Sequence, residues 1–501
     1  MLVIFLTFLI TATFLYYGLI KPVTYWQRHG VKQLSAYEIW KRNLMMLIQQ
    51  QPVAELFQEL YNLFPGVRYS GIYQFLDKSL IIKDVDLIKK ITIKDFDHFA
   101  NHKSISPGEV LWEKNLFSLK DEKWKNMRNI LSPSFTSSKM KMMFNLVADC
   151  ADQFVNYFEE KMQNSSCVSV EMKDASTRFA NDVIASTAFG ITCDSLTHPN
   201  NEFYMMGRKI TPQVGFWKTV QLIIIFNLPI LAKICGLRYL SKTASKYFFK
   251  VIQKTLRDRE RKKIVRYDMI HLMMEARKQS KEKLSDVDIT AQALLFFFGG
   301  FDTISTLVSF MTHELAVNVD VQKRLRKEIE ETLKECNGMI NYDALFNMKY
   351  LDMVVNETLR KWPSGIVTDR VCSKPYEIVP EKPGEVSVFL QKGDVVWIPF
   401  FGLHRDPKLF PNPERFDPER FSEENKSNFN ANAYIPFGFG PRACIANRYA
   451  LMEVKLFFFK LLSKFDIVVV DKTVVPLKLA NVSFQMTAEG GFWVGLQSRV
   501  K

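Results

Sequence analysis

The chain contains little cysteine, and none of it at C-x-x-C spacing. Seven cysteines occur among 501 residues, an odd number that argues against a complete disulfide framework. The missing spacing argues equally against a zinc site built on paired cysteines. We therefore expect free, reduced thiols, as in the cytosol. Internal repeats and low-complexity segments are also absent, so nothing in the sequence indicates a repeat architecture.

Negative charge is scarce relative to positive charge. The 67 Lys and Arg against 53 Asp and Glu give a formal net charge of +14. Such an excess can indicate nucleic-acid binding. Here the basic residues are spread along the chain without a nucleic-acid-binding motif, so we expect no nucleic-acid partner. A basic surface also suits anionic lipid headgroups and an acidic protein partner.

Charge is missing altogether from residues 1–20. At about 1.5 Å per residue a helix of this length spans roughly 30 Å, the thickness of one bilayer core. Basic residues follow from Lys21 onward, which places the rest of the chain on the cytosolic side. A cleaved signal peptide is the alternative, but its basic leading segment and small-x-small cleavage site are not evident. We expect a transmembrane anchor at 1–20, a linker with a first helix at 21–50 and one folded unit at 51–501.

A second apolar stretch, Gly215–Cys235, is interrupted by Lys218, Asn227 and Pro229. These interruptions argue against a full membrane span. Two interpretations stay open: a helical hairpin that dips into a membrane surface, and a helix buried in the core.

Hydrophobic periodicity predicts a mainly α-helical fold with smaller β regions. Residues 68–82 alternate apolar and polar as a hairpin does, and helical periodicity dominates from about 84 to 362. Ser285 and Asp288 begin a capping-box-like motif, which predicts a long helix over about 285–317. Strands and turns are expected over 366–400, and a further helix after Cys444. The composition, 47% hydrophobic and 13% aromatic, suits a large core.

The run Phe437–Ala446 places Cys444 directly after a glycine-rich turn and before the apolar stretch Tyr449–Leu462. At the start of a helix, backbone N–H groups and the helix dipole both favour a thiolate. A thiolate is an axial ligand that pushes electron density onto haem iron. Arg442 could pair with a haem propionate. The alternative interpretation is a buried structural cysteine.

The predicted long helix carries Gly299, Gly300, Asp302 and Thr303. Each glycine costs a helix interior roughly 1 kcal/mol relative to alanine, so a groove for oxygen or substrate would account for them. An acid in this apolar setting is costly unless it is paired or hydrated. Together, Asp302 and Thr303 could pass protons to bound oxygen. The alternative is a core helix with a stray polar pair.

These motifs resemble the cytochrome P450 family, in the family's order and over roughly residues 60–500. The matching motifs are the acid–alcohol pair Asp302–Thr303, E-x-x-R at Glu357–Arg360, P-E-R-F at Pro418–Phe421, W-x-x-x-R at Trp124–Arg128 and the haem signature Phe437–Ala446. The runs Asn115–Leu119 and Leu131–Phe135 are similar to microsomal insect members that metabolise xenobiotics. The resemblance implies the P450 fold, with a long central helix over the haem.

The resemblance also implies roles for individual residues. Cys444 is the implied iron ligand, and Asp302 and Thr303 are the implied proton relay. The implied haem contacts are Trp124, Arg128, Arg370, Phe437, Arg442 and Cys444. In addition, Glu357, Arg360 and Arg420 are expected to form a buried cluster that shapes the haem pocket.

Three local features need separate interpretation beside these family motifs. Pro413–Phe416 repeats the four letters of Pro418–Phe421, and the later copy is preferred for its distance to Cys444. His404 precedes R-D-P and is expected to be a hydrogen-bonded turn residue rather than a ligand. At Ala446 many members carry glycine, so its methyl group is expected to crowd the haem slightly.

The implied function is a haem–thiolate monooxygenase that inserts one atom of O2 into lipophilic small molecules. Because no flavin- or nicotinamide-binding fingerprint is evident, the electrons must come from another protein. The resemblance implies NADPH–cytochrome P450 reductase, with cytochrome b5 as an optional second partner, at the endoplasmic reticulum membrane. Haem b is the implied cofactor, and Lys123 and Lys125 are expected to face the reductase. The alternatives are a haem–thiolate isomerase or dehydratase, and a non-catalytic membrane haem-binding protein.

The resemblance further implies an aromatic-rich substrate cavity. Its expected lining residues are Phe297, Phe298, Phe301, Ile366, Val367 and Phe484. Plant toxins, insecticides and endogenous lipids all remain open as substrates.

Overall fold

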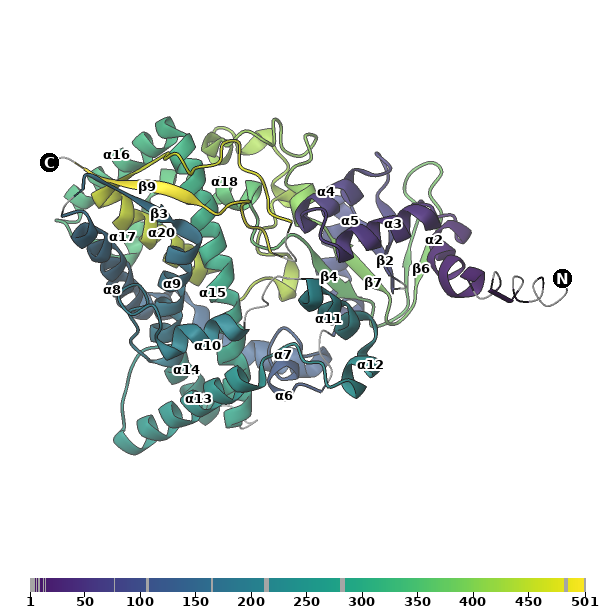
Figure 1. Ribbon diagram of the computed structural model, residues 1–501, viewed down its shortest axis with the longest axis horizontal. Coiled ribbons are helices and arrows are strands. Elements are labelled where there is room, and N and C mark those ends of the chain that lie inside the picture. The colour runs from purple at the N-terminus through teal and green to yellow at the C-terminus, as the bar shows by residue number, and fades with distance from the viewer. Residues whose placement is uncertain are drawn as a thin grey trace.

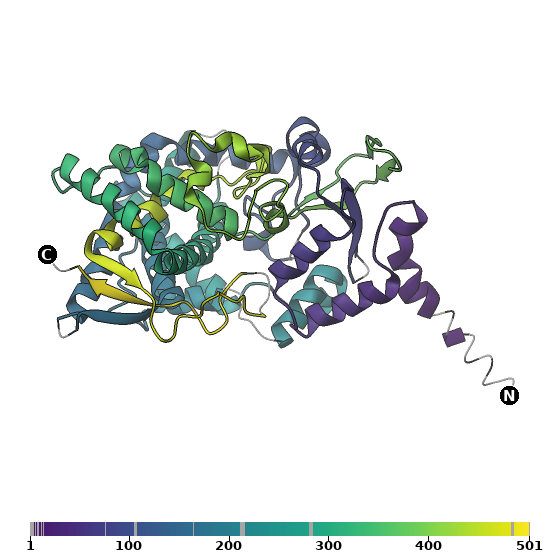
Figure 2. The ribbon, with the colours of Figure 1, turned by 90° about the horizontal axis from the view of Figure 1, so that it is seen from above.

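The computed structural model consists of a large helical lobe and a smaller lobe built around a β-sheet (Figures 1 and 2). The N- and C-termini lie at opposite ends of the long axis in both views. The structure describes residues 5, 7, 10, 11, 13, 15–75, 77–104, 108–163, 165–210, 216–279, 284–481 and 485–499. Among these residues the fold is mainly helical with small sheets, as predicted.

The main sheet has the strand order β1-β2-β7-β4. Strands β1 (Tyr69–Gln74) and β2 (Asp77–Ile82) pair antiparallel, which confirms the predicted hairpin. Strand β2 pairs in parallel with β7 (Val395–Ile398), and β7 pairs antiparallel with β4 (Thr368–Val371). Strands β4 and β7, which are far from β1 and β2 in sequence, therefore complete the sheet that the N-terminal hairpin begins.

Two smaller sheets lie apart from the main one. Antiparallel pairing joins β3 (Cys167–Glu171), β9 (Trp493–Ser498) and β8 (Phe465–Val468) in the order β3-β9-β8, at the C-terminal end of the molecule (Figure 1). Strands β5 (Tyr376–Ile378) and β6 (Val388–Leu390) form the third sheet.

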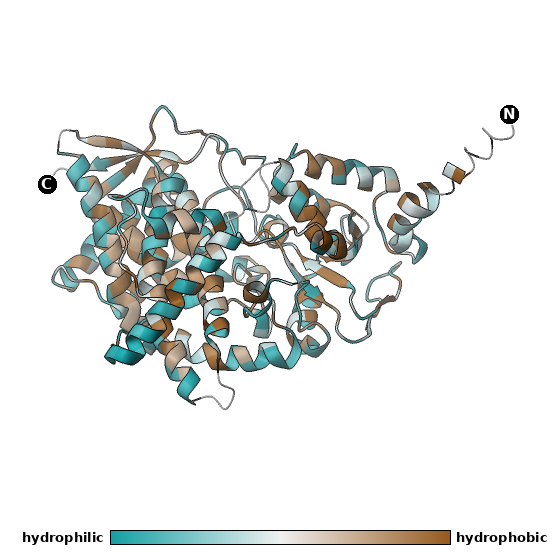
Figure 3. Cartoon of the chain, turned by 60° about the horizontal axis from the view of Figure 1, so that its bottom comes forward, coloured by the Kyte–Doolittle hydropathy of each residue, from teal (hydrophilic) through white to brown (hydrophobic). Residues whose placement is uncertain are grey.

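Most of the remaining described residues form helices. Beside the main sheet they are α2 (Tyr25–Arg28), α3 (Ala36–Leu47), α4 (Val53–Asn62), α5 (Val85–Lys89) and α19 (Phe400–Leu403). Elsewhere they are α6 (Val110–Glu113), α7 (Asp121–Leu131), α8 (Ser137–Lys161), α9 (Met172–Ile184), α10 (Glu202–Ile210), α11 (Phe216–Asn227), α12 (Pro229–Ile234), α13 (Lys242–Lys262), α14 (Met269–Gln279), α15 (Asp286–Val317), α16 (Val319–Glu335), α17 (Tyr342–Asn347), α18 (Lys349–Lys361) and α20 (Asn447–Lys464). The outer helices carry hydrophilic and hydrophobic residues along their length, as helices do when they bury one face (Figure 3).

Helix α15 is the long helix that the capping motif predicted. The Ser285 side chain accepts from the Asp288 N–H and the Asp288 carboxylate accepts from the Ser285 N–H, so the capping box is complete. By length and composition α15 is the one described helix that could cross a membrane, but most of its residues are buried inside the helical lobe. It is the core helix against which α9, α18 and α20 pack.

The apolar stretch Gly215–Cys235 forms two helices, α11 and α12, with a break at Leu228–Pro229. Helix α11 is partly buried through Leu222 and Ile225, whereas α12 exposes Ile230 and Ile234, each to 77%. A single helix buried in the core, one of the two interpretations of this stretch, is therefore wrong.

The predicted anchor at residues 1–20 lies partly outside the described residues. The large apolar side chains that are described there, from Phe5 to Ile20, are exposed. No feature among them shows a bilayer contact, so the anchor stays a prediction.

Candidate active site

Two adjoining cavities lie between α15 and the loops that face it. The larger cavity has a volume of about 880 Å³ and the smaller one about 450 Å³. Phe117, Gly365 and Val367 line both, so the two cavities meet at these residues. A concave, apolar site with a few convergent polar groups is the usual form of a small-molecule site.

Cys444 lies on the wall of the smaller cavity. Gly438 and Gly440, with φ of 77° and 70°, turn the chain just before it. A Cβ on Gly440 would lie 2.0 Å from the Thr92 carbonyl oxygen, so this turn requires glycine. The thiol is open to the cavity but deep inside the molecule. Burial raises its pKa, while the Ala446 N–H and the Arg128 charge oppose that rise.

Arg128 and Arg370 reach the same smaller cavity from α7 and β4. Arg370 is 1% exposed, and burial lowers the pKa of its guanidinium to about 10. Its Nη1 donates to the Asp369 carbonyl at 2.7 Å, but its buried Nε has no hydrogen-bond partner among the described residues. An unpaired buried guanidinium N–H is costly, and an anionic group at the cavity edge would satisfy it.

His102 also lines this cavity, and the sequence analysis missed it. Its Nδ1 lies 3.0 Å from the Asp369 carboxylate, and its ring stacks on Phe117 at 4.3 Å. A ring held on both sides presents a fixed edge to the cavity. Its partner Asp369 is 267 residues away, so no local sequence signal could have found it.

Arg442 and Trp124 contact each other rather than extending freely into the cavity. The Arg442 guanidinium lies 4.2 Å from the Trp124 ring. Its N–H groups donate to backbone carbonyls, at 2.7 Å to Ala100 and 2.7 Å to Leu119. Arg442 thus holds together the loop that faces Cys444, a positioning task that the sequence analysis did not predict.

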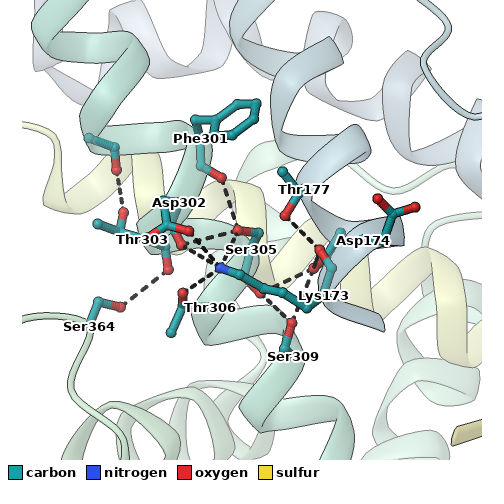
Figure 4. Close-up of polar contacts among 12 residues, drawn as sticks. Lys173, Asp174, Thr177, Phe301, Asp302, Thr303, Ser305, Thr306, Ser309 and Ser364 are labelled. Carbon is teal, nitrogen blue, oxygen red and sulfur yellow. Dashed lines mark hydrogen bonds and ion pairs between the residues drawn. The ribbon is translucent and has the colours of Figure 1, made fainter. Parts of the chain in front are cut away.

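Asp302 and Thr303 are neighbours on α15, but they face different cavities. Thr303 lines the smaller cavity with Cys444, and its hydroxyl donates to the Gly299 carbonyl. Asp302 lines the larger cavity, and its Oδ1 lies 2.8 Å from the Lys173 Nζ (Figure 4). The pair therefore stands at the boundary between the two cavities.

The two glycines before this pair, Gly299 and Gly300, are explained by different surroundings. A Cβ on Gly299 would meet nothing within 4 Å, which is the open groove that the helix sequence predicted. A Cβ on Gly300 would lie 2.3 Å from Ile184 Cδ1. Gly300 therefore serves the close packing of α9 against α15, and like Gly299 it also lines the smaller cavity.

The structure brings Glu357, Arg360 and Arg420 together, all three with side chains 8% exposed or less. The Glu357 carboxylate lies 2.7 Å from Arg360 Nε and 3.5 Å from Arg420 Nε. In the rival copy of the motif, the Arg415 side chain is exposed and only its carbonyl contacts Arg360. The later copy is the one that joins the cluster.

His404 lies outside both cavities, on the far side of this cluster. Its Nε2 accepts from the Ile435 N–H at 3.0 Å, and its carbonyl accepts from Arg360 at 2.8 Å. Burial lowers its pKa to about 3, so the ring is neutral at neutral pH. As expected from the sequence, it is a hydrogen-bonded turn residue.

Of the predicted substrate residues, Phe298, Ile366 and Val367 line the larger cavity. Phe297 and Phe301 do not lie on the described walls of either cavity, which corrects their prediction. They stack on each other at 4.9 Å within an aromatic cluster between α15, α10 and α13. Phe484 lies outside the described residues.

The residues around the smaller cavity fit a haem. Cys444 supplies a thiol, Phe437 and Ala446 line the wall beside it, and Arg128 and Arg370 supply cations. The orphaned Arg370 Nε matches the carboxylate that a haem would bring. Fold and site together fit the class of haem–thiolate proteins.

Comparisons with known proteins identify the family. The sequence profile of the cytochrome P450 family matches residues 41–493. The chain is 45% identical to cytochrome P450 9e2 of Blattella germanica (91% of this chain, 90% of that protein). It is 40% identical to the probable cytochrome P450 9f2 of Drosophila melanogaster (91% of each) and 36% identical to cytochrome P450 6k1 of Blattella germanica (97% and 95%). The chain belongs to the cytochrome P450 family, in its insect type, and is a monooxygenase that uses haem iron and O2.

Proposed function

We propose that this chain is a membrane-anchored monooxygenase of lipophilic small molecules, supplied with electrons from NADPH by NADPH–cytochrome P450 reductase, with cytochrome b5 as an optional second donor. Its substrates are xenobiotics such as plant toxins or insecticides, or endogenous lipids. The observation that carries the proposal is the pair of adjoining cavities, with Cys444 and Thr303 on the walls of the smaller one.

The walls of the larger cavity support a lipophilic substrate. Phe57, Leu222, Phe226, Phe298 and Ile366 present apolar side chains to it. Burial of apolar substrate surface contributes roughly 25 cal/mol per Å². Helix α11 supplies part of this wall, and with α12 it forms the apolar pair whose exposed side chains suit a membrane surface. A substrate dissolved in lipid would meet this part of the molecule first.

The smaller cavity supports the assignment of the haem site. Cys444 would hold the iron, and Arg128, Arg370 and His102 would face the propionates, with Arg442 and Trp124 fixing the loop. The bound haem supplies the activation of O2 by way of its thiolate ligand. Thr303 holds a hydroxyl at the edge of the same cavity, where it can pass a proton that Asp302 receives.

The endoplasmic reticulum is the proposed location, with residues 1–20 as the anchor and residues 51–501 on the cytosolic side. Lys123 and Lys125 are exposed on α7, the helix that also carries Trp124 and Arg128. Exposed cations beside the haem site suit an acidic redox partner.

The test is turnover by the purified holoenzyme with added reductase. Product from a lipophilic probe should require NADPH, O2 and reductase together, and carbon monoxide on the reduced protein should give the red-shifted Soret band of thiolate ligation. Thr303→Ala should keep its haem and divert electrons to hydrogen peroxide, lowering product per NADPH by at least about tenfold. Turnover without reductase, or unchanged coupling in Thr303→Ala, would contradict the proposal.

A further inference from the structure

The Lys173 side chain reaches Asp302, the acid of the proposed proton relay, from a different helix. It lies in the first turn of α9, where the Glu171 carboxylate accepts from its backbone N–H at 3.2 Å. Its side chain crosses to α15, where Nζ lies 2.8 Å from Asp302 Oδ1 and 3.3 Å from the Asp302 carbonyl (Figure 4). The same Nζ donates to the hydroxyls of Ser305 at 2.9 Å and Thr306 at 2.7 Å.

These contacts use all the N–H groups of the lysine, because an ammonium has three donors and four oxygens surround it. The hydrogen bonding of the Asp302 carboxylate is less complete. Asp302 Oδ2 is buried and has no hydrogen-bond partner among the described residues. One carboxylate oxygen is therefore fixed by the lysine, and the other is left to accept a proton or a water.

Both members of the ion pair lie on the wall of the larger cavity, with side chains 23% exposed for Lys173 and 14% for Asp302. Thr303, the next residue, lies on the wall of the smaller cavity. Lys173 thus fixes the carboxylate toward one cavity while the alcohol faces the other.

We propose that Lys173 is a positioning residue that holds the Asp302 carboxylate by an ion pair on the wall of the larger cavity, so that protons for the reaction are taken from that cavity. Each proton taken up at Oδ2 and passed on toward Thr303 is replaced by one from water in the larger cavity, and the carboxylate returns to its ion pair. This inference rests on the proposed relay role of Asp302 and Thr303.

Other charged groups near the pair are accounted for elsewhere. On α9, Asp174 pairs with Arg178 at 2.8 Å, and Glu171 caps the helix. The remaining charged side chains on the wall of the larger cavity are Arg208, Lys103, which pairs with Asp77, and Asp369, which contacts His102. In the described parts of the chain, Lys173 is the one cation within ion-pair distance of Asp302.

Removing this charge should change the protonation of Asp302. A buried carboxylate without a cation favours its neutral form. In Lys173→Met and Lys173→Gln, the Asp302 carboxylate should therefore hold a proton more tightly than in the wild type and pass it on less readily. The acid limb of the pH profile for product formed per NADPH should move to higher pH. Lys173→Arg, which keeps the charge, should restore the wild-type profile.

The experiment uses the holoenzyme and five variants of the same pair. Coupling and peroxide release are measured from pH 6 to 9 for the wild type, Lys173→Met, Lys173→Gln, Lys173→Arg, Asp302→Asn and the double variant Lys173→Met with Asp302→Asn. Infrared difference spectra of the resting proteins, without turnover, should show a new carboxylic-acid C=O band in Lys173→Met that the double variant lacks. The double variant should couple no worse than Asp302→Asn alone, because Lys173 acts through Asp302.

Three results would overturn the inference: an unmoved acid limb in both uncharged variants, additive losses in the double variant, or no acid band. Lys173→Gln keeps a donor for Ser305 and Thr306, so it remains informative if Lys173→Met does not hold haem. The carbon monoxide spectrum and the reductase requirement of the wild type test the proposed function separately. A normal carbon monoxide spectrum together with an unchanged pH profile in the uncharged variants would contradict only the role of Lys173.

Discussion

Two ion clusters, one buried and one partly buried beside a cavity, attach neighbouring segments to the helices of the large lobe, and they differ in how completely their carboxylates are satisfied. In the Glu357 cluster, Arg360 donates to the Glu357 carboxylate, to the His404 carbonyl and to the Pro413 carbonyl at 2.7 to 2.8 Å. The Asp417 N–H donates to the same carboxylate at 2.9 Å. The Glu357 and Arg360 side chains are 0% exposed.

In the Lys173 cluster the cation is fully used, but the Asp302 carboxylate borders a cavity and has one oxygen without a hydrogen-bond partner in the described parts of the chain. A closed network of buried charges is rigid, because losing any partner leaves a bare charge in the interior. A half-open one beside a cavity can exchange protons and water. The comparison separates a cluster that shapes the site from one that can take part in it.

The largest effect is expected from breaking the closed cluster. Glu357→Ala leaves Arg360 buried without its carboxylate and should destabilise the fold by about 3–5 kcal/mol, with loss of haem. Thermal unfolding and haem content measure this. Glu414→Ala is the matched control, since Glu414 is 69% exposed and contacts Arg405 only at 3.4 Å. Equal, small losses in both variants would show that the Glu357 cluster is not closed in this sense.

A smaller effect, confined to acid, is expected at His404, whose carbonyl belongs to the closed cluster. Its pKa of about 3 lies below the ordinary 6.5, because burial disfavours the charged ring. The unfolded chain therefore binds a proton that the folded chain does not, and stability falls as the pH drops below 6.5. Between pH 6.5 and 5 this should cost about 2 kcal/mol.

His404→Gln keeps an acceptor for the Ile435 N–H and has no ring to protonate, so its stability should fall less over that interval. Urea unfolding at pH 7, 6 and 5 gives the measurement. His198→Gln, at an exposed histidine, should follow the wild type. A His404→Gln curve parallel to the wild type would mean that acid does not reach the closed cluster through this ring.

The smallest effect is expected in the half-open cluster. Thr306→Val removes one of the four oxygens around Lys173, and the three that remain still match its three N–H groups, so the cost should stay at or below about 1 kcal/mol. Thr312→Val is the control, because its buried hydroxyl bonds only within α15, to the Val308 carbonyl. Thermal unfolding compares the two. A loss of 3 kcal/mol or more at Thr306 would place the two clusters in the same class and remove the contrast.

The sequence predicted what depends on local signals. The Ser285–Asp288 capping box, the hairpin at 68–82 and the turn before Cys444 are each written in a few consecutive residues, and the structure has each of them. The E-x-x-R spacing likewise places Glu357 and Arg360 on one helix face.

What the sequence did not predict depends on packing between distant segments. Phe297 and Phe301 are apolar and lie near the cavities in sequence, but α10 and α13 cover their side of α15, and Phe297 fits against Gly207. Lys173 meets Asp302 across 129 residues. The role of Arg442 in holding the loop likewise required the positions of the Ala100 and Leu119 carbonyls.

The two cavities have only three lining residues in common among those described, Phe117, Gly365 and Val367, and this has an evolutionary consequence. Because the larger cavity (the vestibule) and the smaller cavity (the reaction chamber) share so few side chains, replacements around the vestibule can alter which molecules are admitted. Such replacements leave Cys444, Thr303 and the residues that position them unchanged. Selection can thus broaden the range of substrates of such an enzyme while its catalytic residues stay the same.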